Sequence, residues 1–176
     1  PTFQALSPVA RAHRAWLVAG LPERTEDGAL YNSALVIDPD GVLRFVYRKT
    51  LLFEADCTWA SPGDSGYAAF DTEGGRFGVG ICMDLNDPGF VEWVGAARLD
   101  VVALPTNWLW EGLPVWPYWT LRLSGTRATL VAANSYGPEG DIVFCGRSAI
   151  LQGGKVLAGA PPEGDTVISA RVLAAY

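Results

Sequence analysis

The stretch 78-GVGICMDLND-87 ends a small, apolar run with a cysteine and follows it at once with a polar, turn-prone cluster. Next, 88-PGFVEWVGAARL-99 has helical spacing with Pro88 near its start. It is followed by 100-DVVALPTNW-108, a short apolar run that ends in polar residues. The resulting order of strand, cysteine turn, helix and strand predicts an α/β domain with Cys82 at the exit of a buried strand.

The rest of the chain predicts more strands interleaved with helices. A helix is expected to begin at Pro8 after a Ser7 cap and to lead into a buried strand. The runs 31–38 and 42–49 predict a hairpin with Lys49 at its outgoing end, and residues 50–66 predict a loop. Further predicted elements are a second hairpin that ends at Cys82, a helix over 116–128, a strand over 129–135, a glycine-rich loop, and a closing hairpin of 147–152 and 155–159 with a strand over 166–172.

Length and composition limit the classes of protein that this chain can be. The 176 residues suit a single domain, and 49% hydrophobic with 18% charged residues is a globular composition. A net charge of -6 and a pI near 4.7 leave no basic stripe, so nucleic acid and anionic membrane are not expected partners. No apolar run reaches the roughly 20 residues of a membrane span, and the first residues lack the order of a signal peptide. We therefore expect a cytoplasmic protein.

The cysteines do not suggest a disulfide framework or a metal site. Cys57, Cys82 and Cys145 are odd in number and contain no close pair, and no cluster of residues has the spacing of metal ligands. We therefore expect no metal and no cofactor. The chain begins at Pro1 rather than at methionine, which suggests a processed chain, a fragment or a trimmed sequence.

Cys82 has two interpretations. A thiol at a sharp turn between a strand and a helix lies near backbone N–H groups that stabilise a thiolate and an oxyanion, so Cys82 is a candidate nucleophile. Alternatively, it packs as a small hydrophobic core residue. Cys57 and Cys145 are weaker candidates.

A nucleophilic thiol needs a base, and the sequence does not favour histidine for this role. His13 is the one histidine, and it falls in the helix ahead of the first predicted strand. Lys49 and Lys155 are the two lysines against eleven arginines. Lysine is a compact donor to developing negative charge, so Lys49 is either a catalytic residue or an exposed lysine at a strand end.

Polar and aromatic residues near the predicted strand exits are candidates for substrate binding. Asp87 is expected to cap the following helix, whereas Asp84 is a candidate for contact with substrate. Asn107 and Trp108 follow a strand and are candidates to line a cleft. Four tryptophans fall within 105–119, which favours packing or a subunit interface over a ligand site.

Six segments resemble the carbon-nitrogen hydrolase, or nitrilase, superfamily over nearly the whole chain. They are 47-YRKTLLF-53, 59-WASPG-63, 78-GVGICMDLND-87, 104-LPTNW-108, 130-LVAANSYGPEG-140 and 146-GRSAI-150. The resemblance implies a four-layer αββα sandwich and a Glu, Lys, Cys catalytic triad. Lys49 and Cys82 fall on the lysine and cysteine positions of that triad.

The resemblance also implies a reaction. Cys82 would attack an amide or nitrile carbon, Lys49 and the backbone N–H of Met83 would stabilise the oxyanion, and ammonia or an amine would leave from a thioester acyl-enzyme. A second carboxylate follows the lysine in the family, and here it is Glu54 or Asp56. The CMDLN run is similar to the amidase branch that includes protein N-terminal asparagine amidases, so a small or peptide-terminal amide is the expected substrate.

The family's general-base glutamate has no counterpart in this sequence. It lies, with the opening strand and helix, before the position where this sequence begins, and nothing in residues 1–15 matches it. We therefore expect 1–176 to form one domain that lacks those parts, with the base supplied by an absent segment or a separate N-terminal chain. The alternative is a catalytically incomplete remnant of the same fold with a binding or assembly role.

The family resemblance suggests an oligomer. Sandwiches of this kind commonly pair through the helical face beyond the nucleophile. We expect a homodimer or a higher oligomer, with residues 108–119 near the contact.

Overall fold

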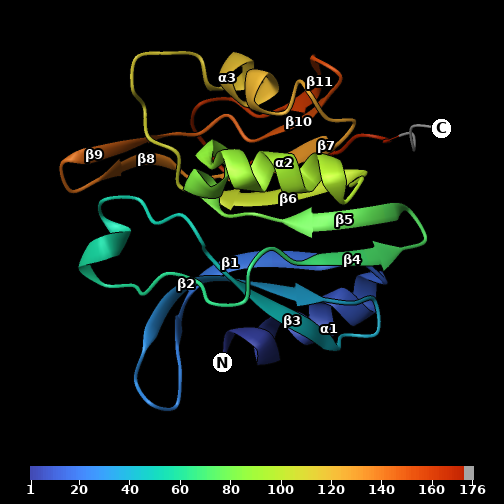
Figure 1. Ribbon diagram of the computed structural model, residues 1–176, viewed down its shortest axis with the longest axis vertical. Helices are drawn as coiled ribbons and strands as arrows, with labels where there is room; N and C mark the ends of the chain where they lie inside the picture. Colours follow the sequence, from blue (N-terminus) through green and yellow to red (C-terminus); the bar gives the residue numbers. More distant parts are fainter. Residues whose placement is uncertain (173–176) are drawn as a thin grey trace. The chain divides into compact units, whose positions relative to one another are not determined.

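The computed structural model describes residues 1–172, and the chain divides into two units, Pro1–Ala68 and Ala69–Tyr176 (Figure 1). The first unit is built on an antiparallel meander in the order β1-β2-β3. Its elements are α1 (Thr2–His13), β1 (Leu17–Arg24), β2 (Leu30–Ile37), β3 (Leu43–Arg48) and the 3-10 helix η1 (Asp56–Thr58). The predicted hairpin is confirmed, because β2 and β3 pair antiparallel and Lys49 follows the last residue of β3.

Helix α1 packs on one face of this meander. Ala10 of α1 forms a small core with Leu35 and Ile37, which alternate on β2 and so share a face. The predicted start of the helix was wrong, because α1 begins at Thr2 and contains Pro8. Ser7 is buried and its hydroxyl donates to the carbonyl of Gly41 at 2.6 Å, so a tertiary contact takes the side chain that was expected to cap the helix.

The second unit is built on a six-stranded sheet in the order β11-β10-β7-β6-β5-β4. Strands β5, β6 and β7 run parallel, and the other pairs in the sheet are antiparallel. Its elements are β4 (Ala69–Thr72), β5 (Gly75–Val79), the 3-10 helix η2 (Cys82–Asn86), α2 (Pro88–Ala96), β6 (Val101–Thr106), α3 (Val115–Arg122), β7 (Thr129–Asn134), β8 (Tyr136–Glu139), β9 (Ile142–Cys145), β10 (Ala149–Gln152) and β11 (Lys155–Gly159).

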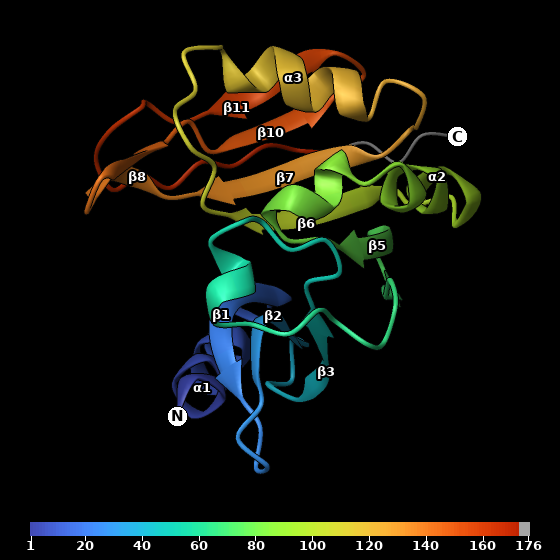
Figure 2. The same cartoon turned by 60° about the vertical axis from the view of Figure 1, so that its left-hand side comes forward.

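Helices α2 and α3 cover the same face of this sheet. A Cβ built on Gly80 would lie 2.6 Å from the ring of Phe90 in α2, and one on Gly159 would lie 2.5 Å from Trp116 in α3. The strand register places Gly159 beside Ala149. Following the paired residues from β10 across β7 and β6 leads to the position beside Gly80. A Cβ on either glycine would therefore point to the same face of the sheet. Figure 2 shows the two helices on this side of the sheet.

Three predicted elements of the second unit differ from the structure. The expected glycine-rich loop contains a two-stranded ribbon of β8 and β9, with its turn at residues 140–141. Residues 166–172 form no strand. The helix expected over 116–128 is shorter, because it ends at Arg122 and a turn through residues 124–126 precedes β7. The α/β class, the β10-β11 hairpin and the strand, cysteine turn, helix, strand order are confirmed.

Within residues 1–172, no helix is long and apolar enough to cross a membrane. The prediction that residues 1–176 form one domain stays a prediction.

Candidate active site

Cys82 stands at the turn that follows the first of the parallel strands. Strand β5 ends at Val79, and Cys82 opens the 3-10 helix η2 with a backbone φ of +48°. A side chain other than glycine in this left-handed region costs roughly 1–3 kcal/mol, so the surrounding structure must hold the turn in place. The Cys82 side chain is partly exposed, unlike a packed core cysteine.

Two neighbouring residues fix this turn. Gly80 has no room for a Cβ because the Phe90 ring lies directly against it. Asp84 is fully buried, and its carboxylate accepts a hydrogen bond from the N–H of Ile81 at 2.8 Å. Asp84 therefore holds the turn around Cys82. The predicted contact of Asp84 with substrate stays a prediction.

Met83 and Asp87 flank the start of the helical segment. Met83 is the second residue of η2, so its N–H falls in the first turn, where helix amides point out of the helix N-terminus. The carboxylate of Asp87 accepts from the N–H of Gly89 at 2.9 Å, which confirms Asp87 as the cap of α2. The assignment of Met83 to the oxyanion stays a prediction.

In the first unit, Lys49 is held by Asp56. Lys49 is 2% exposed, and its Nζ donates to Asp56 Oδ2 at 2.5 Å. The same oxygen accepts from the N–H of Phe53 at 2.9 Å, and Asn32 Nδ2 donates to Asp56 Oδ1 at 3.1 Å. The lysine is therefore a buried cation with a defined direction, and it is not an exposed lysine at a strand end.

The surroundings of Asp56 favour its charged form. Burial raises the pKa of the Asp56 carboxyl, but the hydrogen bond from Lys49, that from the Phe53 N–H and the nearby ammonium charge outweigh it, so the pKa lies below its ordinary value. Glu54, the other candidate for the supporting carboxylate, is exposed. The structure therefore brings Asp56, and not Glu54, against Lys49.

Asn107 and Trp108 follow β6, and they lie at the same end of the parallel strands as Cys82. Val79 pairs with Ala103, and three residues further along the chain lie Cys82, just after β5, and Thr106, the last residue of β6. The carboxyl ends of parallel strands are where ligands bind in open α/β sheets. Asn107 is exposed and its Oδ1 accepts from the hydroxyl of Ser135 at 2.6 Å, whereas Trp108 is partly buried. Substrate contact at Asn107 and Trp108 stays a prediction.

Asn134 at the exit of β7 was not among the predicted site residues. Its Oδ1 accepts from the N–H of Trp108 at 2.7 Å, and its Nδ2 donates to the carbonyl of Gly146 at 2.5 Å. The signal was present in the sequence, because Asn134 lies within the family-like segment 130–140 at the end of an apolar run. Its partners come from two other segments, so the sequence alone did not mark it.

Cys145 and Cys57 differ from Cys82 in their surroundings. Cys145 is buried and its Sγ accepts from Asn134 Nδ2 at 3.2 Å. Burial raises the pKa of the Cys145 thiol and Cys82 contributes further in the same direction, so Cys145 stays protonated at neutral pH. Cys57 is exposed in η1.

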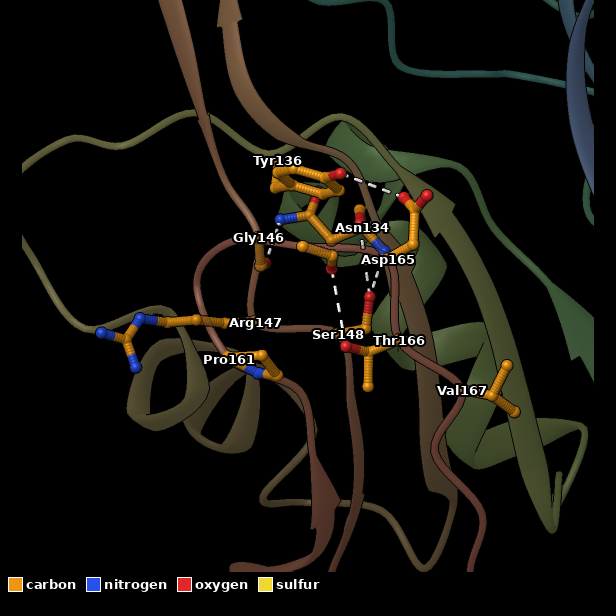
Figure 3. Close-up of a pocket in the computed structure, with 10 residues that line it drawn as sticks. Asn134, Tyr136, Gly146, Arg147, Ser148, Pro161, Asp165, Thr166 and Val167 are labelled. Carbon is orange, nitrogen blue, oxygen red and sulfur yellow. Dashed lines mark hydrogen bonds between the residues drawn. The ribbon is translucent and has the colours of Figure 1, made fainter.

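A pocket of about 350 Å³ lies beside Asn134 in the second unit (Figure 3). Residues 146–148, Tyr136 and the segment 161–167 contribute to its wall, and the hydroxyl of Tyr136 donates to Asp165 Oδ1 at 3.0 Å. The labelled Arg147 side chain points away from the other side chains drawn in Figure 3. None of the residues predicted for catalysis or binding lines this pocket. Among residues 1–172, no group of His, Cys, Asp or Glu side chains could hold a metal ion.

Comparison with known proteins decides the family. The model of the carbon-nitrogen hydrolase family matches residues 1–176. The chain belongs to the carbon-nitrogen hydrolase family. The chain is 32% identical to a probable nitrilase from Schizosaccharomyces pombe, over 96% of this chain and 63% of that protein. It is 29% identical to a protein N-terminal amidase of the same organism, over 86% of this chain and 67% of that protein.

The chain shares its fold with a solved amidase. A variant of the amidase from Nesterenkonia sp. AN1, in which acrylamide has added at the active site cysteine, matches 92% of this chain and 65% of its own length, with 25% identity and a TM-score of 0.83. That amidase is from the nitrilase superfamily. The nitrilase-type fold inferred from the sequence is confirmed. The chain spans about two thirds or less of the length of these three relatives.

The predicted site residues of this chain thus fall into two sets. Lys49 and Asp56 meet in the first unit, and Cys82 shares a sheet edge with Asn107 and Trp108 in the second. The meeting of the two sets in one site stays a prediction.

Proposed function

We propose that this carbon-nitrogen hydrolase is a cysteine amidohydrolase that converts a carboxamide to a carboxylate and ammonia. The observation that carries the proposal is Cys82, a partly exposed thiol on a left-handed turn at the carboxyl edge of three parallel strands. The Nesterenkonia amidase of the same fold carries acrylamide on its active site cysteine. A small or peptide-terminal amide is the proposed substrate class.

The reaction runs in two halves through Cys82. The base removes the thiol proton, the sulfur attacks the amide carbon, and the carbonyl π electrons move to oxygen to form a tetrahedral oxyanion. Collapse of the oxyanion breaks the C–N bond, and ammonia leaves with the proton that the base returns. Water, deprotonated by the same base, then attacks the thioester and the C–S bond breaks. The base returns its proton to the thiolate, and the carboxylic acid leaves and ionises to the carboxylate in solution.

Lys49 is proposed to stabilise the oxyanion, together with the N–H of Met83. The ion pair with Asp56 fixes the direction of the buried Lys49 side chain. A preorganised cation in a water-poor site stabilises developing negative charge more than it would in water. Asp56 is therefore a positioning residue for Lys49.

The general base is proposed to be a carboxylate that lies outside residues 1–176. The family's base glutamate has no match in this sequence, and the chain spans 63% of the probable nitrilase that it resembles. A preceding segment or a separate chain would supply it. The amide is proposed over the nitrile because relatives with amidase names include the protein N-terminal amidase and an omega-amidase from Xenopus tropicalis, which is 30% identical over 96% of this chain.

The test uses the protein in its natural length and measures ammonia release over a panel of carboxamides, nitriles and N-carbamoyl compounds. Ammonia release from at least one carboxamide is expected, and Cys82→Ala should lower it at least about a thousandfold, because nucleophilic catalysis contributes on this scale. Mass spectrometry should show acrylamide adding faster to the peptide that carries Cys82 than to the peptides of the exposed Cys57 and the buried Cys145.

Two outcomes would contradict the proposal. Turnover that survives Cys82→Ala would remove Cys82 as the nucleophile. No turnover, with Cys82 no more reactive than Cys145, would favour the catalytically incomplete remnant with a binding or assembly role.

A further inference from the structure

The Asn134 side chain joins two segments at the carboxyl ends of the parallel strands. It accepts from the Trp108 N–H at 2.7 Å and donates to the Gly146 carbonyl at 2.5 Å. A side-chain amide can accept on one end and donate on the other, which a hydroxyl or a carboxylate does not do in this geometry. Trp108 is further held because its carbonyl accepts from the N–H of Cys145 at 2.9 Å.

The main chain of Asn134 is held as well. Its N–H donates to the Ser148 hydroxyl at 2.9 Å, at the start of β10 (Figure 3). Asn134 is also the strand partner of Thr106, the last residue of β6. The exits of β6 and β7 are therefore fixed relative to each other by both backbone and side chain.

The constraint continues from Trp108 toward the nucleophile turn. The Trp108 ring lies 5.7 Å from the rings of Tyr118 and Trp119, edge-on to the latter. The Tyr118 hydroxyl donates to Asn86 Oδ1 at 2.7 Å. Asn86 is the last residue of η2, the short helix that Cys82 begins.

We propose that Asn134, Trp108, Tyr118 and Asn86 form a brace across the three parallel strand exits, with Asn134 as the positioning residue that sets the gap between Cys82 and Trp108. Cys82 follows β5 and Trp108 follows β6, and these neighbouring strands lie about 4.8 Å apart. A brace that fixes so short a span limits the group that can sit between thiol and indole. The brace therefore selects carboxamides with short acyl chains and rejects bulky ones.

This inference rests on the proposed function for its substrate, but its test includes a measurement that does not need turnover. In the natural-length protein, kcat and KM are measured for acetamide and for a bulky carboxamide such as phenylacetamide. The alkylation rates of Cys82 by iodoacetamide and by N-phenylmaleimide are measured beside them. The two variants are Asn134→Ala, which removes the side-chain link, and the milder Tyr118→Phe, which removes the hydroxyl and keeps the ring.

Both variants should reduce the preference for the small reagent. Asn134→Ala should raise KM for acetamide roughly tenfold with a smaller change in kcat, and it should lower the iodoacetamide to N-phenylmaleimide rate ratio by a similar factor. Tyr118→Phe should change both in the same direction by less. The double variant should fall short of the summed effects, because both changes loosen one connected network.

Asp100 provides the matched control, because it lies at the opposite, amino-terminal end of the parallel strands. Its carboxylate accepts from the N–H of Arg76 at 2.8 Å and pairs with Arg127 at 2.8 Å, so it also joins strand ends. Asp100→Ala should lower the melting temperature without changing either size preference.

Size preferences that stay unchanged in both brace variants would overturn the brace. Equal changes in Asp100→Ala would overturn it too, because they would reflect general loosening of the sheet. If Cys82→Ala keeps its ammonia release, the proposed function fails, and the alkylation ratios still decide on the brace.

Discussion

Single residues set the chemistry that is proposed for this chain. Cys82 is held in a left-handed conformation by its neighbours, and Lys49 is buried as a cation against Asp56. Both arrangements cost free energy that a residue with only a packing role would not need. These free-energy costs, at two residues of the implied triad, support the proposal that both residues are catalytic.

Asp56→Ala should lower the free energy of unfolding by about 3 kcal/mol, because it leaves the Lys49 ammonium buried without a partner. Urea unfolding of the natural-length protein measures this. Asp64→Ala is the control: Asp64 is 65% exposed and pairs with Arg48 at 3.4 Å, so its loss should cost under about 1 kcal/mol. Equal losses in the two variants would contradict the buried pair.

The same pair should give the protein an acid-sensitive stability. The pKa of Asp56 is lower in the folded protein, so its contribution is present above the unfolded pKa of about 3.9 and is lost as the pH falls through the folded value. Urea titrations from pH 6 down to about pH 2 should show this loss in the wild type and a shallower one in Asp56→Asn. An unchanged acid slope in Asp56→Asn would contradict the assignment.

At the scale of elements, the packing of α2 on β5 holds the cysteine turn. Glycines at 78 and 80 let the helix approach the strand, because a side chain at either position would meet the rings of Trp93 or Phe90. Asp87 caps α2, and the buried carboxylate of Asp84 holds the turn by accepting a hydrogen bond from the N–H of Ile81. The position of Cys82 is therefore determined by the contact of a helix with a strand.

Gly80→Ala should destabilise the protein by roughly 1–3 kcal/mol, because its Cβ would overlap the Phe90 ring. It should also slow the reaction of Cys82 with acrylamide by displacing the turn. Gly95→Ala is the control within α2, where a Cβ meets nothing within 4 Å and helix propensity should add up to about 1 kcal/mol. Thermal unfolding and acrylamide labelling measure both effects, and a stable, fully reactive Gly80→Ala would refute this packing role.

At the scale of the whole molecule, large apolar side chains stay exposed near α3. Trp110 is 52% exposed, Leu113 is 75% exposed and Leu121 is 67% exposed. Trp110 and Leu113 belong to the tryptophan-rich stretch 108–119, and Leu121 lies two residues after it. We propose that this surface pairs with a second copy of the protein, as the sequence resemblance implied.

Sedimentation of the natural-length protein should therefore give at least a dimer. Leu113→Asp should shift the species toward the monomer by placing a charge in the apolar contact. Val167→Asp, at a side chain that is 96% exposed outside this surface, should leave the mass unchanged. A wild-type monomer at micromolar concentration would remove the proposal.

The sequence alone determined the α/β class, the family and the candidate pair of Cys82 and Lys49. Local patterns suffice for these, because a strand that ends in a cysteine turn and a strand that ends in lysine are properties of neighbouring residues. The cap at Asp87 was readable for the same reason. The start of α1 was not, because Ser7 bonds to Gly41, 34 residues away.

Only the tertiary structure chose Asp56 over Glu54, placed Asp84 inside the turn and revealed Asn134. Glu54 and Asp56 are two residues apart and chemically alike, and what separates them is burial against Lys49 and a hydrogen bond from Asn32. Asn134 gains its role from Trp108 and Gly146, which lie 26 and 12 residues away. Hydrogen bonds between distant segments depend on how the chain folds back on itself, and residue types along one stretch do not encode that.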